Sequence, residues 1–254
     1  MTTSTDQSGE RALRVIGLNL LHGGGTRVPA LADAVIALEA DVAVLPEFRP
    51  NGKRADQLMS ALAKAGFVHQ EWTNPPDPLV PNGVAIVSRL PFDAVLLPFA
   101  GSPNGQRVLE VQVAGVDVVG VYFPNQAPKV RFWRDEFLPW SRARLAAPAV
   151  LIGDWNSGSH YLDEAGATLP GAAEFDAMTT MGWTDAWRSL HPDGREFTWY
   201  SRPWWNGFRI DHAFLAPSMR PRLLDARYEH GTRTDRPGVP VTVSDHSAVI
   251  VDLA

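Results

Sequence analysis

The sequence predicts an α/β protein built as a four-layer α/β/β/α sandwich, in which two mixed β-sheets pack on each other and helices flank them. Three observations lead to this prediction. Amphipathic helical segments alternate with short apolar strands early in each half of the chain, hairpin-like runs of strands follow, and 45% of the 254 residues are hydrophobic. We expect residues 13–254 to form a single domain, preceded by a polar, disordered tail over residues 1–12.

Apolar periodicity places the elements of the first half. Residues 14–20 form a β-rich run that ends in a glycine-rich turn, and residues 42–45 form a short, continuous apolar strand. Residues 29–39 and 54–65 carry apolar side chains at helical spacing, so both are expected to be amphipathic helices. Four more strands, separated by turn residues, are expected at 84–87, 94–99, 107–113 and 116–122.

The second half of the chain repeats this theme. A long helix is expected over residues 130–146, and an apolar strand over residues 150–152 follows it. A shorter helix is expected over residues 175–181. The remaining strands are expected at 197–200, 210–215 and 247–253. The loops that contain several prolines, residues 75–81 and 231–240, are expected to border a site.

Composition restricts the possible functions. The chain has no cysteine, which excludes disulfides, thiolate metal sites and a cysteine nucleophile. It has no apolar stretch long enough to span a bilayer and no signal-peptide core in residues 1–12, so we expect a cytoplasmic protein. The net charge of −5 is not typical of a nucleic-acid binder. Residues 195–236 nevertheless hold eight arginines and five acidic residues. This local excess of positive charge either forms a basic rim that could grip phosphate or reflects a general preference for arginine in this chain.

Short polar signatures follow apolar strands along the whole chain. They are Gly17-Leu18-Asn19, Leu45-Pro46-Glu47, Tyr122-Phe123-Pro124-Asn125, Gly153-Asp154-Trp155-Asn156, Arg209-Ile210-Asp211-His212 and Ser244-Asp245-His246. Carboxylates, amides and imidazoles at strand ends predict one site at the rim of the sheets. Hard oxygen donors together with histidine are the groups that a divalent-metal phosphoesterase uses.

In this order the signatures resemble those of the endonuclease/exonuclease/phosphatase superfamily, over nearly the whole chain. Residues 122–125, 181–187 and 197–215 are most similar to the exonuclease III and apurinic-endonuclease branch. The resemblance implies hydrolysis of phosphodiesters with Mg²⁺ or Mn²⁺ as cofactor and DNA as the substrate. No obligate protein partner is evident, and we expect a monomer.

The resemblance also implies roles for the acidic and amide residues. Glu47 and Asp245 are expected to hold the metal, and Asn19 to orient Glu47 or contact the metal. Asp154 is expected to orient or deprotonate the attacking water. Asn156 is expected to steady the substrate phosphate or the transition state.

The resemblance implies that the remaining catalytic candidates act at the phosphate, either directly or through a neighbouring side chain. Asp211 is expected to pair with His246 and to favour the protonated imidazole, which then donates a hydrogen bond to the phosphate or leaving group. Tyr122 and Asn125 can donate to the phosphate from the loop after a strand. Whether Asp154 or His246 is the base stays open. The complete set of acids, amides and histidine argues against a non-catalytic binding module of the same fold.

Four residues are candidates for further substrate contacts. Trp204 and Trp205 could stack on a nucleotide or only cap the sandwich, and Arg209 offers a guanidinium for phosphate. His22 either reaches the rim of the site or only stabilises a turn. Enzymes of the exonuclease III type carry a polar residue where this chain has Leu21, and a broader group of superfamily hydrolases has the Asn-x-x-His-Gly form. Small or lipid-linked phosphoesters therefore remain an alternative, as in a sphingomyelinase-like or inositol-phosphate phosphatase-like enzyme.

Overall fold

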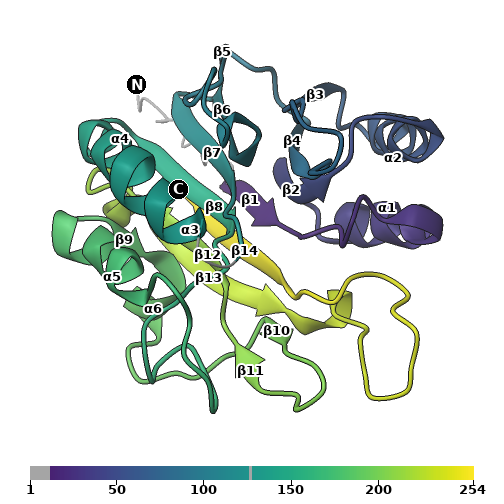
Figure 1. The fold of residues 1–254 in the computed structure, drawn as a ribbon. Helices are drawn as coiled ribbons and strands as arrows, with labels where there is room; N and C mark the ends of the chain where they lie inside the picture. Colours follow the sequence, from purple (N-terminus) through teal and green to yellow (C-terminus); the bar gives the residue numbers. More distant parts are fainter. Residues whose placement is uncertain (1–11, 126–127) are drawn as a thin grey trace, which may run out of the picture.

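The computed structural model describes residues 12–125 and 128–254, so most of the expected tail lies outside the described residues. Two mixed sheets pack on each other, and helices cover their outer faces (Figure 1). The first sheet has the order β13 (Leu223–Glu229), β14 (Ala248–Leu253), β1 (Leu13–Gly17), β2 (Val42–Phe48), β4 (Gly83–Ser88) and β3 (His69–Trp72). The second has the order β5 (Ala94–Leu96), β6 (Val108–Val113), β7 (Val116–Tyr122), β8 (Ala149–Asp154), β12 (Asp211–Leu215) and β9 (Thr184–Asp185). The predicted four-layer α/β/β/α architecture is confirmed.

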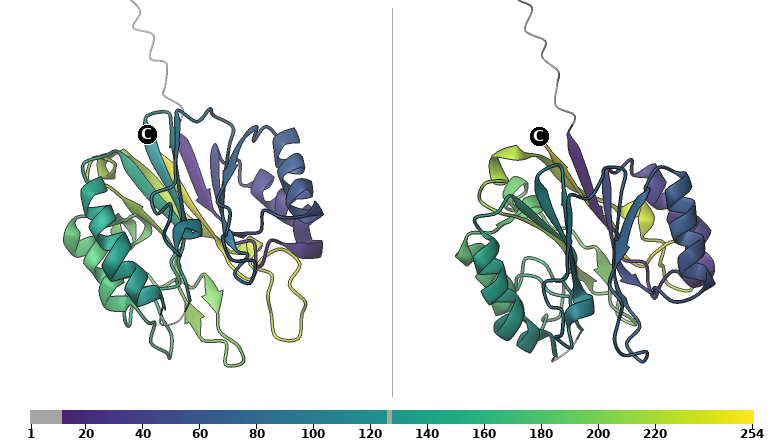
Figure 2. Two further views of the ribbon diagram at one scale, coloured as in Figure 1. Left: turned by 45° about the horizontal axis from the view of Figure 1, so that its top comes forward. Right: turned by 90° about the horizontal axis from the view of Figure 1, so that it is seen from above.

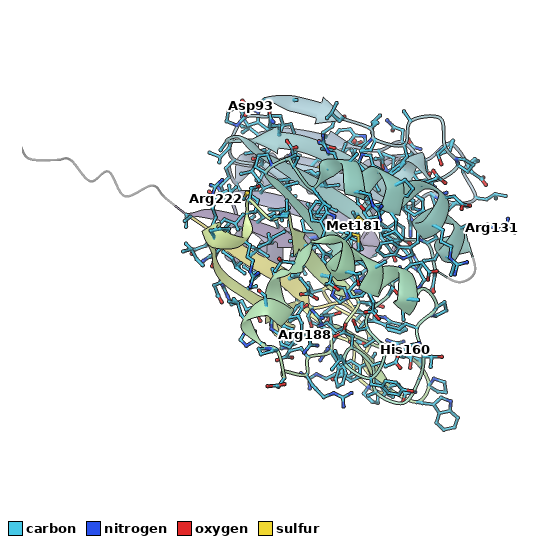
Figure 3. The ribbon with its side chains drawn as sticks, turned by 90° about the vertical axis from the view of Figure 1, so that its left-hand side faces the viewer. Asp93, Arg131, His160, Met181, Arg188 and Arg222 are labelled. Carbon is cyan, nitrogen blue, oxygen red and sulfur yellow. The ribbon has the colours of Figure 1, made fainter. Side chains whose placement is uncertain are left out.

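Helices on the two sides complete the layers. The first sheet is covered by α1 (Val28–Ala37) and α2 (Lys53–Lys64). The other side carries α3 (Pro128–Arg131), η3 (Phe132–Phe137), α4 (Leu138–Arg144), α5 (Ala172–Met181) and α6 (Ala186–Leu190). Figure 3 looks onto this second helical side, where Met181 ends α5 and Arg188 lies on α6. Short 3₁₀ turns are η1 (Gly25–Arg27), η2 (Gly105–Arg107), η4 (Arg220–Arg222) and η5 (His230–Thr232).

Strand direction brings the polar signatures to one end of the sheets. β1 runs parallel to β2, and β7 runs parallel to β8, so the carboxyl ends of each pair lie together. β12 and β14 run antiparallel to β8 and β1, so their amino ends lie at the same end. A small hairpin of β10 (Trp199–Tyr200) and β11 (Gly207–Phe208) projects there, while β1 begins and β14 finishes at the opposite end (Figure 2).

The core explains why the central strands are apolar without interruption. Val15 of β1 lies in the core between the sheets, whereas its neighbour Ile16 packs under α1 and α2. In β2, Val42 likewise lies in the core between the sheets, and Ala43 packs under the helices. A strand with both faces buried therefore has no polar face to show in the sequence.

Several elements differ from the predicted ones. The helix expected over residues 130–146 is interrupted by one stretch of π-helix, η3. β3 and β13 were not predicted, and both are edge strands with half-exposed side chains.

Among the residues that the structure describes, none of the helices combines the length and apolar character needed to cross a membrane.

Candidate active site

The expected strand ends meet at one place. Asp154 ends β8 and is in register with Tyr122 of β7 and with Asp211 of β12. Gly153 makes this possible, because it has a φ of 144° and any Cβ there would collide with the carbonyl oxygen of Val121.

Several of these residues line one cavity of about 410 Å³ at this end of the sheets. Its lining includes the expected residues His22, Glu47, Asn125, Asp154, Asn156, Asp245 and His246. Asn19 and Asp211 lie directly behind this lining, and both are almost completely buried. Residues from both halves of the chain therefore contribute to a single site.

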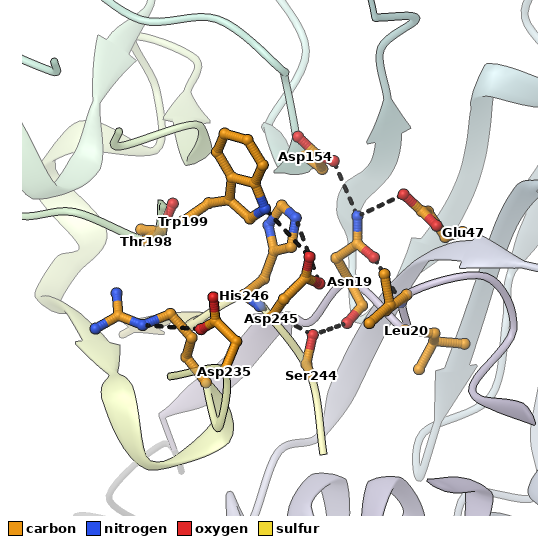
Figure 4. Close-up of polar contacts among 12 residues, drawn as sticks. Asn19, Leu20, Glu47, Asp154, Thr198, Trp199, Asp235, Ser244, Asp245 and His246 are labelled. Carbon is orange, nitrogen blue, oxygen red and sulfur yellow. Dashed lines mark hydrogen bonds and ion pairs between the residues drawn. The ribbon is translucent and has the colours of Figure 1, made fainter. Parts of the chain in front are cut away.

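Asn19 lies between two carboxylates (Figure 4). Its Nδ2 donates to Asp154 Oδ2 at 2.9 Å and lies 3.4 Å from Glu47 Oε1. Its Oδ1 accepts from the backbone N–H of Leu21 at 2.8 Å, and Ser244 Oγ donates to its backbone carbonyl at 2.6 Å. Asn19 thus fixes the separation of Glu47 and Asp154. Its bond from Ser244 also connects an early segment of the chain with a late one at the site.

Glu47 accepts hydrogen bonds from separate segments. The backbone N–H of His22 donates to Oε2 at 2.7 Å, and Asn82 Nδ2 donates to the same oxygen at 3.0 Å. The hydroxyl of Tyr122 lies 3.4 Å from Oε1. Burial acts to raise the pKa of Glu47, but the hydrogen bonds and charge of His22 prevail and lower that pKa to about 2. Glu47 is therefore an anion at neutral pH.

A buried tryptophan orients the Asp154 turn. Trp155 stacks on Phe123 with ring centroids 5.3 Å apart, and its Nε1 donates to the carbonyl of His212 at 3.0 Å. With Trp155 turned into the core, Asp154 and Asn156 are left on the cavity side. The backbone N–H of Asn156 donates to Asp154 Oδ1 at 2.9 Å, which is the hydrogen bond of an Asx turn. One carboxylate therefore both closes the turn and lines the cavity.

Burial tunes Asp154 for proton transfer. The pKa of Asp154 is raised to about 7, mainly by burial and further by the charges of Asp211 and Glu47. The charge of His246 and the hydrogen bond from the Asn156 backbone act in the opposite direction. A carboxyl group with a pKa near neutrality is suited to act as a general base at neutral pH.

His246 and Asp211 form a buried pair, with Nδ1 of the imidazole 2.9 Å from Asp211 Oδ2. Burial acts to lower the pKa of His246, but the charge and hydrogen bond of Asp211, with Asp245 and Asp154, raise that pKa well above its ordinary value. Nε2 lies 4.0 Å from Asp245 Oδ1. The imidazole is thus a cation that donates to Asp211 from Nδ1, leaving its Nε2–H for a ligand in the cavity.

The residues fit a divalent cation. Asp245 accepts from Trp199 Nε1 at 3.2 Å through Oδ2, but its buried Oδ1 has no hydrogen-bond partner among the residues described. An unpartnered buried carboxylate oxygen is unfavourable, and a cation would satisfy it. Glu47 supplies further hard oxygen donors to the same cavity. Asp154, Asp211 and His246 also lie with ligand-type atoms within 4.8 Å of one another, but the protonated His246 has no lone pair to offer, so Glu47 and Asp245 are the better candidates for holding the cation.

Lys129 and Asn82 take part in the site, although neither was among the predicted site residues. Lys129 is fully buried, lines the cavity and donates from Nζ to the carbonyl of Asn156. Burial lowers the pKa of Lys129 to about 8, although the charge of Asp154 opposes this. Asn82 connects Arg49, whose Nε donates to its Oδ1 at 2.6 Å, with Glu47. The only signal in the sequence was that Lys129 is one of three lysines and follows the Asn125 loop closely.

Arg209 is not brought into the cavity. It is 1% exposed, and its Nε donates to Asp163 Oδ1 at 2.7 Å. Its two terminal nitrogens donate to Asp185 at 3.2 and 2.8 Å. Its guanidinium therefore joins the loop after β8 to β9, inside the fold, where it cannot reach a substrate phosphate.

The tryptophan pair lies in the loop of the β10–β11 hairpin, whose residue Trp199 lines the cavity. Trp204 is 81% exposed. Trp205 is half-buried, with the Arg202 guanidinium 5.6 Å from its ring centroid. The exposed indole of Trp204 offers a flat surface on which a nucleotide can stack, and Arg202 adds a positive charge over the neighbouring ring of Trp205.

Comparison with known proteins places the chain in a family. The model of the endonuclease/exonuclease/phosphatase family matches residues 17–246, which include the polar signatures from Asn19 to His246. The chain belongs to this family, which is hydrolytic and depends on divalent metals. No curated protein sequence matches the chain.

Solved structures agree with this assignment. An AP endonuclease from Archaeoglobus fulgidus is 18% identical with a TM-score of 0.79, and the match covers 95% of this chain and 99% of that one. The 3′ phosphatase NExo from Neisseria, bound to a product DNA hairpin, is 26% identical with a TM-score of 0.78, over 96% and 100% of the two chains. A structure of the 3′–5′ exonuclease NExo from Neisseria meningitidis is also 26% identical, with a TM-score of 0.78, over 95% and 99%.

Proposed function

We propose that the protein is a DNA nuclease of the exonuclease III or apurinic-endonuclease type, which hydrolyses phosphodiesters with Mg²⁺ or Mn²⁺. One observation carries the proposal: a single cavity combines the anionic Glu47, a carboxyl group with a pKa of about 7 in Asp154, and the cationic His246. These are the parts that hydrolysis of an anionic ester requires.

Each group then has a defined task. Glu47 and Asp245 would hold the divalent cation, with Asn19 bracing Glu47, and the cation supplies charge that neutralises phosphate oxygens. Asp154 takes the proton from the attacking water, because its pKa allows the ionised form at neutral pH. Asn156 holds Asp154 in place through its backbone N–H.

The phosphate is held by donors around the cavity. His246 donates from Nε2 to the phosphate or leaving oxygen, while Asp211 retains its Nδ1–H. Tyr122, the last residue of β7, offers a phenol, and Asn125 in the loop that follows offers an amide. Lys129 adds an ammonium group, which suits an anionic ester better than a neutral one.

DNA is favoured as the substrate by the surroundings of the cavity. The exposed Trp204 and the half-buried Trp205 lie in the loop of the β10–β11 hairpin, and Trp199 of the same hairpin lines the cavity. We propose that Trp204 and Trp205 contact a nucleotide next to the cleaved bond, since stacking on an aromatic ring accepts any base. The NExo structure bound to a product DNA hairpin supports the same substrate class.

A hydrolase of small or lipid-linked phosphoesters is the second candidate, and one observation favours it. His22, which belongs to the Asn-x-x-His-Gly form, contacts Glu47 within the cavity. The full-length protein with Mg²⁺ or Mn²⁺ should therefore be assayed on abasic duplex DNA, duplex with a 3′-phosphate, RNA, sphingomyelin vesicles and inositol phosphates. We expect cleavage of the DNA substrates, which weakens steeply as salt is raised. Turnover of only the lipid or inositol esters would contradict the DNA assignment.

A further inference from the structure

The glycine-rich turn after β1 carries His22 to the side of Glu47. Leu21 and His22 both have left-handed backbones, with φ of 50° and 58°, which residues with a Cβ rarely adopt. The turn is fastened at three points: Leu21 N–H donates to Asn19 Oδ1 at 2.8 Å, His22 N–H to Glu47 Oε2 at 2.7 Å, and Gly23 N–H to the Glu47 carbonyl at 2.9 Å. Strained backbone held in this way is typical of functional positions.

We propose that His22 is a nitrogen ligand of the divalent cation that Glu47 binds. Its Nδ1 lies 2.9 Å from Glu47 Oε2 and donates a hydrogen bond to that oxygen, so a cation bound here would take the place of the shared proton. Two neighbouring ligands, each about 2.1 Å from one cation, are themselves about 3 Å apart. The imidazole and the carboxylate are therefore already spaced as adjacent ligands. This inference rests on the metal dependence of the proposed function.

The surroundings of the pair favour a ligand over an ordinary surface ion pair. The side chain of His22 is 61% exposed, and an exposed ion pair stabilises a fold only weakly. Behind the pair, Asn82 Nδ2 donates to Glu47 Oε2 at 3.0 Å and lies 3.4 Å from His22 Nδ1. Arg49 Nε in turn donates to Asn82 Oδ1 at 2.6 Å. Metal ligands characteristically have such a second row of hydrogen bonds, and here it fixes the orientation of Glu47, the carboxylate beside His22.

A nitrogen ligand changes which cation the site prefers. Mg²⁺ takes oxygen ligands almost exclusively, whereas imidazole binds transition metals well. The side chain of Leu21, the residue before His22, has no ligand atom. With His22 beside Glu47, the site is expected to bind Mn²⁺ more tightly than Mg²⁺.

Pulsed EPR of the full-length protein loaded with one equivalent of Mn²⁺ tests the ligand directly. We expect ¹⁴N modulation from a coordinated imidazole, lost in His22→Ala. His230→Ala is the matched control, because His230 Nε2 also lies 2.9 Å from a carboxylate, Glu196 Oε2, but outside the cavity. Modulation that is absent in the wild type, or unchanged in His22→Ala, would overturn the proposal.

Calorimetric titration with Mn²⁺ and Mg²⁺ separates this proposal from the function on which it rests. We expect His22→Ala to raise the Kd for Mn²⁺ about tenfold and to leave the Kd for Mg²⁺ nearly unchanged. Glu47→Gln should weaken the binding of both cations. If Glu47→Gln binds both cations as tightly as the wild type, the metal site of the proposed function is wrong. If Glu47→Gln weakens binding and His22→Ala does not, only the nitrogen ligand is wrong.

Discussion

Replacement of Arg209 by methionine tests whether this residue supports the fold or the substrate. Methionine keeps much of the side-chain volume and removes the charge, so Asp185 loses both hydrogen bonds from Arg209. Asp163 keeps the guanidinium of Arg188 at 2.8 Å, whereas Asp185 keeps only the backbone N–H of Arg188 at 3.0 Å besides its contact with His212, so Asp185 carries most of the loss of charge. Removing one partner of a buried ion pair costs about 3–5 kcal/mol, out of a total stability of about 5–15 kcal/mol. We expect Arg209→Met to lower the free energy of unfolding at pH 7 by about 3–5 kcal/mol.

The expected loss depends on pH in a defined direction. Burial acts to raise the pKa of Asp185, but Arg209 and His212 hold it far below the ordinary value. A carboxyl group whose pKa is depressed by folding contributes stability above its unfolded pKa of about 3.9, and this contribution is lost as the pH falls toward the folded pKa. The difference between wild type and Arg209→Met should therefore be full at pH 7 and shrink below about pH 4.

Urea unfolding followed by tryptophan fluorescence at several pH values measures this difference. Arg227→Met is a suitable control, because Arg227 is 39% exposed and pairs with Asp225 and Asp252 on the surface, where a pair is worth about 0–1 kcal/mol. If Arg209→Met instead keeps wild-type stability and raises only the KM for the substrate, Arg209 contacts the substrate and the buried placement is refuted.

Three further variants test the site. Asp154→Asn should lower kcat about 10²- to 10⁴-fold with the circular dichroism spectrum unchanged, and near-normal turnover would remove Asp154 as the base. Lys129→Met should weaken inhibition by inorganic phosphate about 10- to 100-fold, as expected for loss of a charge-assisted hydrogen bond, and an unchanged inhibition constant would confine Lys129 to a structural role. Trp204→Ala should raise the KM for duplex DNA about 5- to 100-fold while leaving bis(4-nitrophenyl) phosphate unaffected, and equal effects on both would argue against stacking.

The central layers of the fold could be predicted because burial leaves a clear pattern in the sequence. β2 and β8 are buried on both faces and read as continuous apolar runs. The edge strands β3 and β13 carry half-exposed residues, among them Arg227 of β13, which pairs with Asp252 of β14. Their stability comes from neighbouring strands that lie elsewhere in the sequence, so local pattern could not predict them.

The site could be predicted where its residues occur in signatures. Glu47, Asp154 and His246 follow strands and line one cavity. Asn82 belongs to no signature. Its role depends on the hydrogen bond that it donates to Glu47, and only the folded chain brings these two residues together. Arg209 stands within a signature but points into the protein, because it pairs with Asp163 and Asp185. These partners are distant in sequence, so no local pattern could predict the pairing.

The central claim is that distant segments form one catalytic unit, and kinetic coupling between Glu47 and Asp154 tests it most directly. Single-turnover rates with Mg²⁺ would be measured for wild type, Glu47→Gln, Asp154→Asn and the double variant, on a substrate that the wild type cleaves. Residues that act in one step are not additive, so the double variant should lose about as much rate as the slower single variant. Losses that multiply, or no loss in either single variant, would contradict the account.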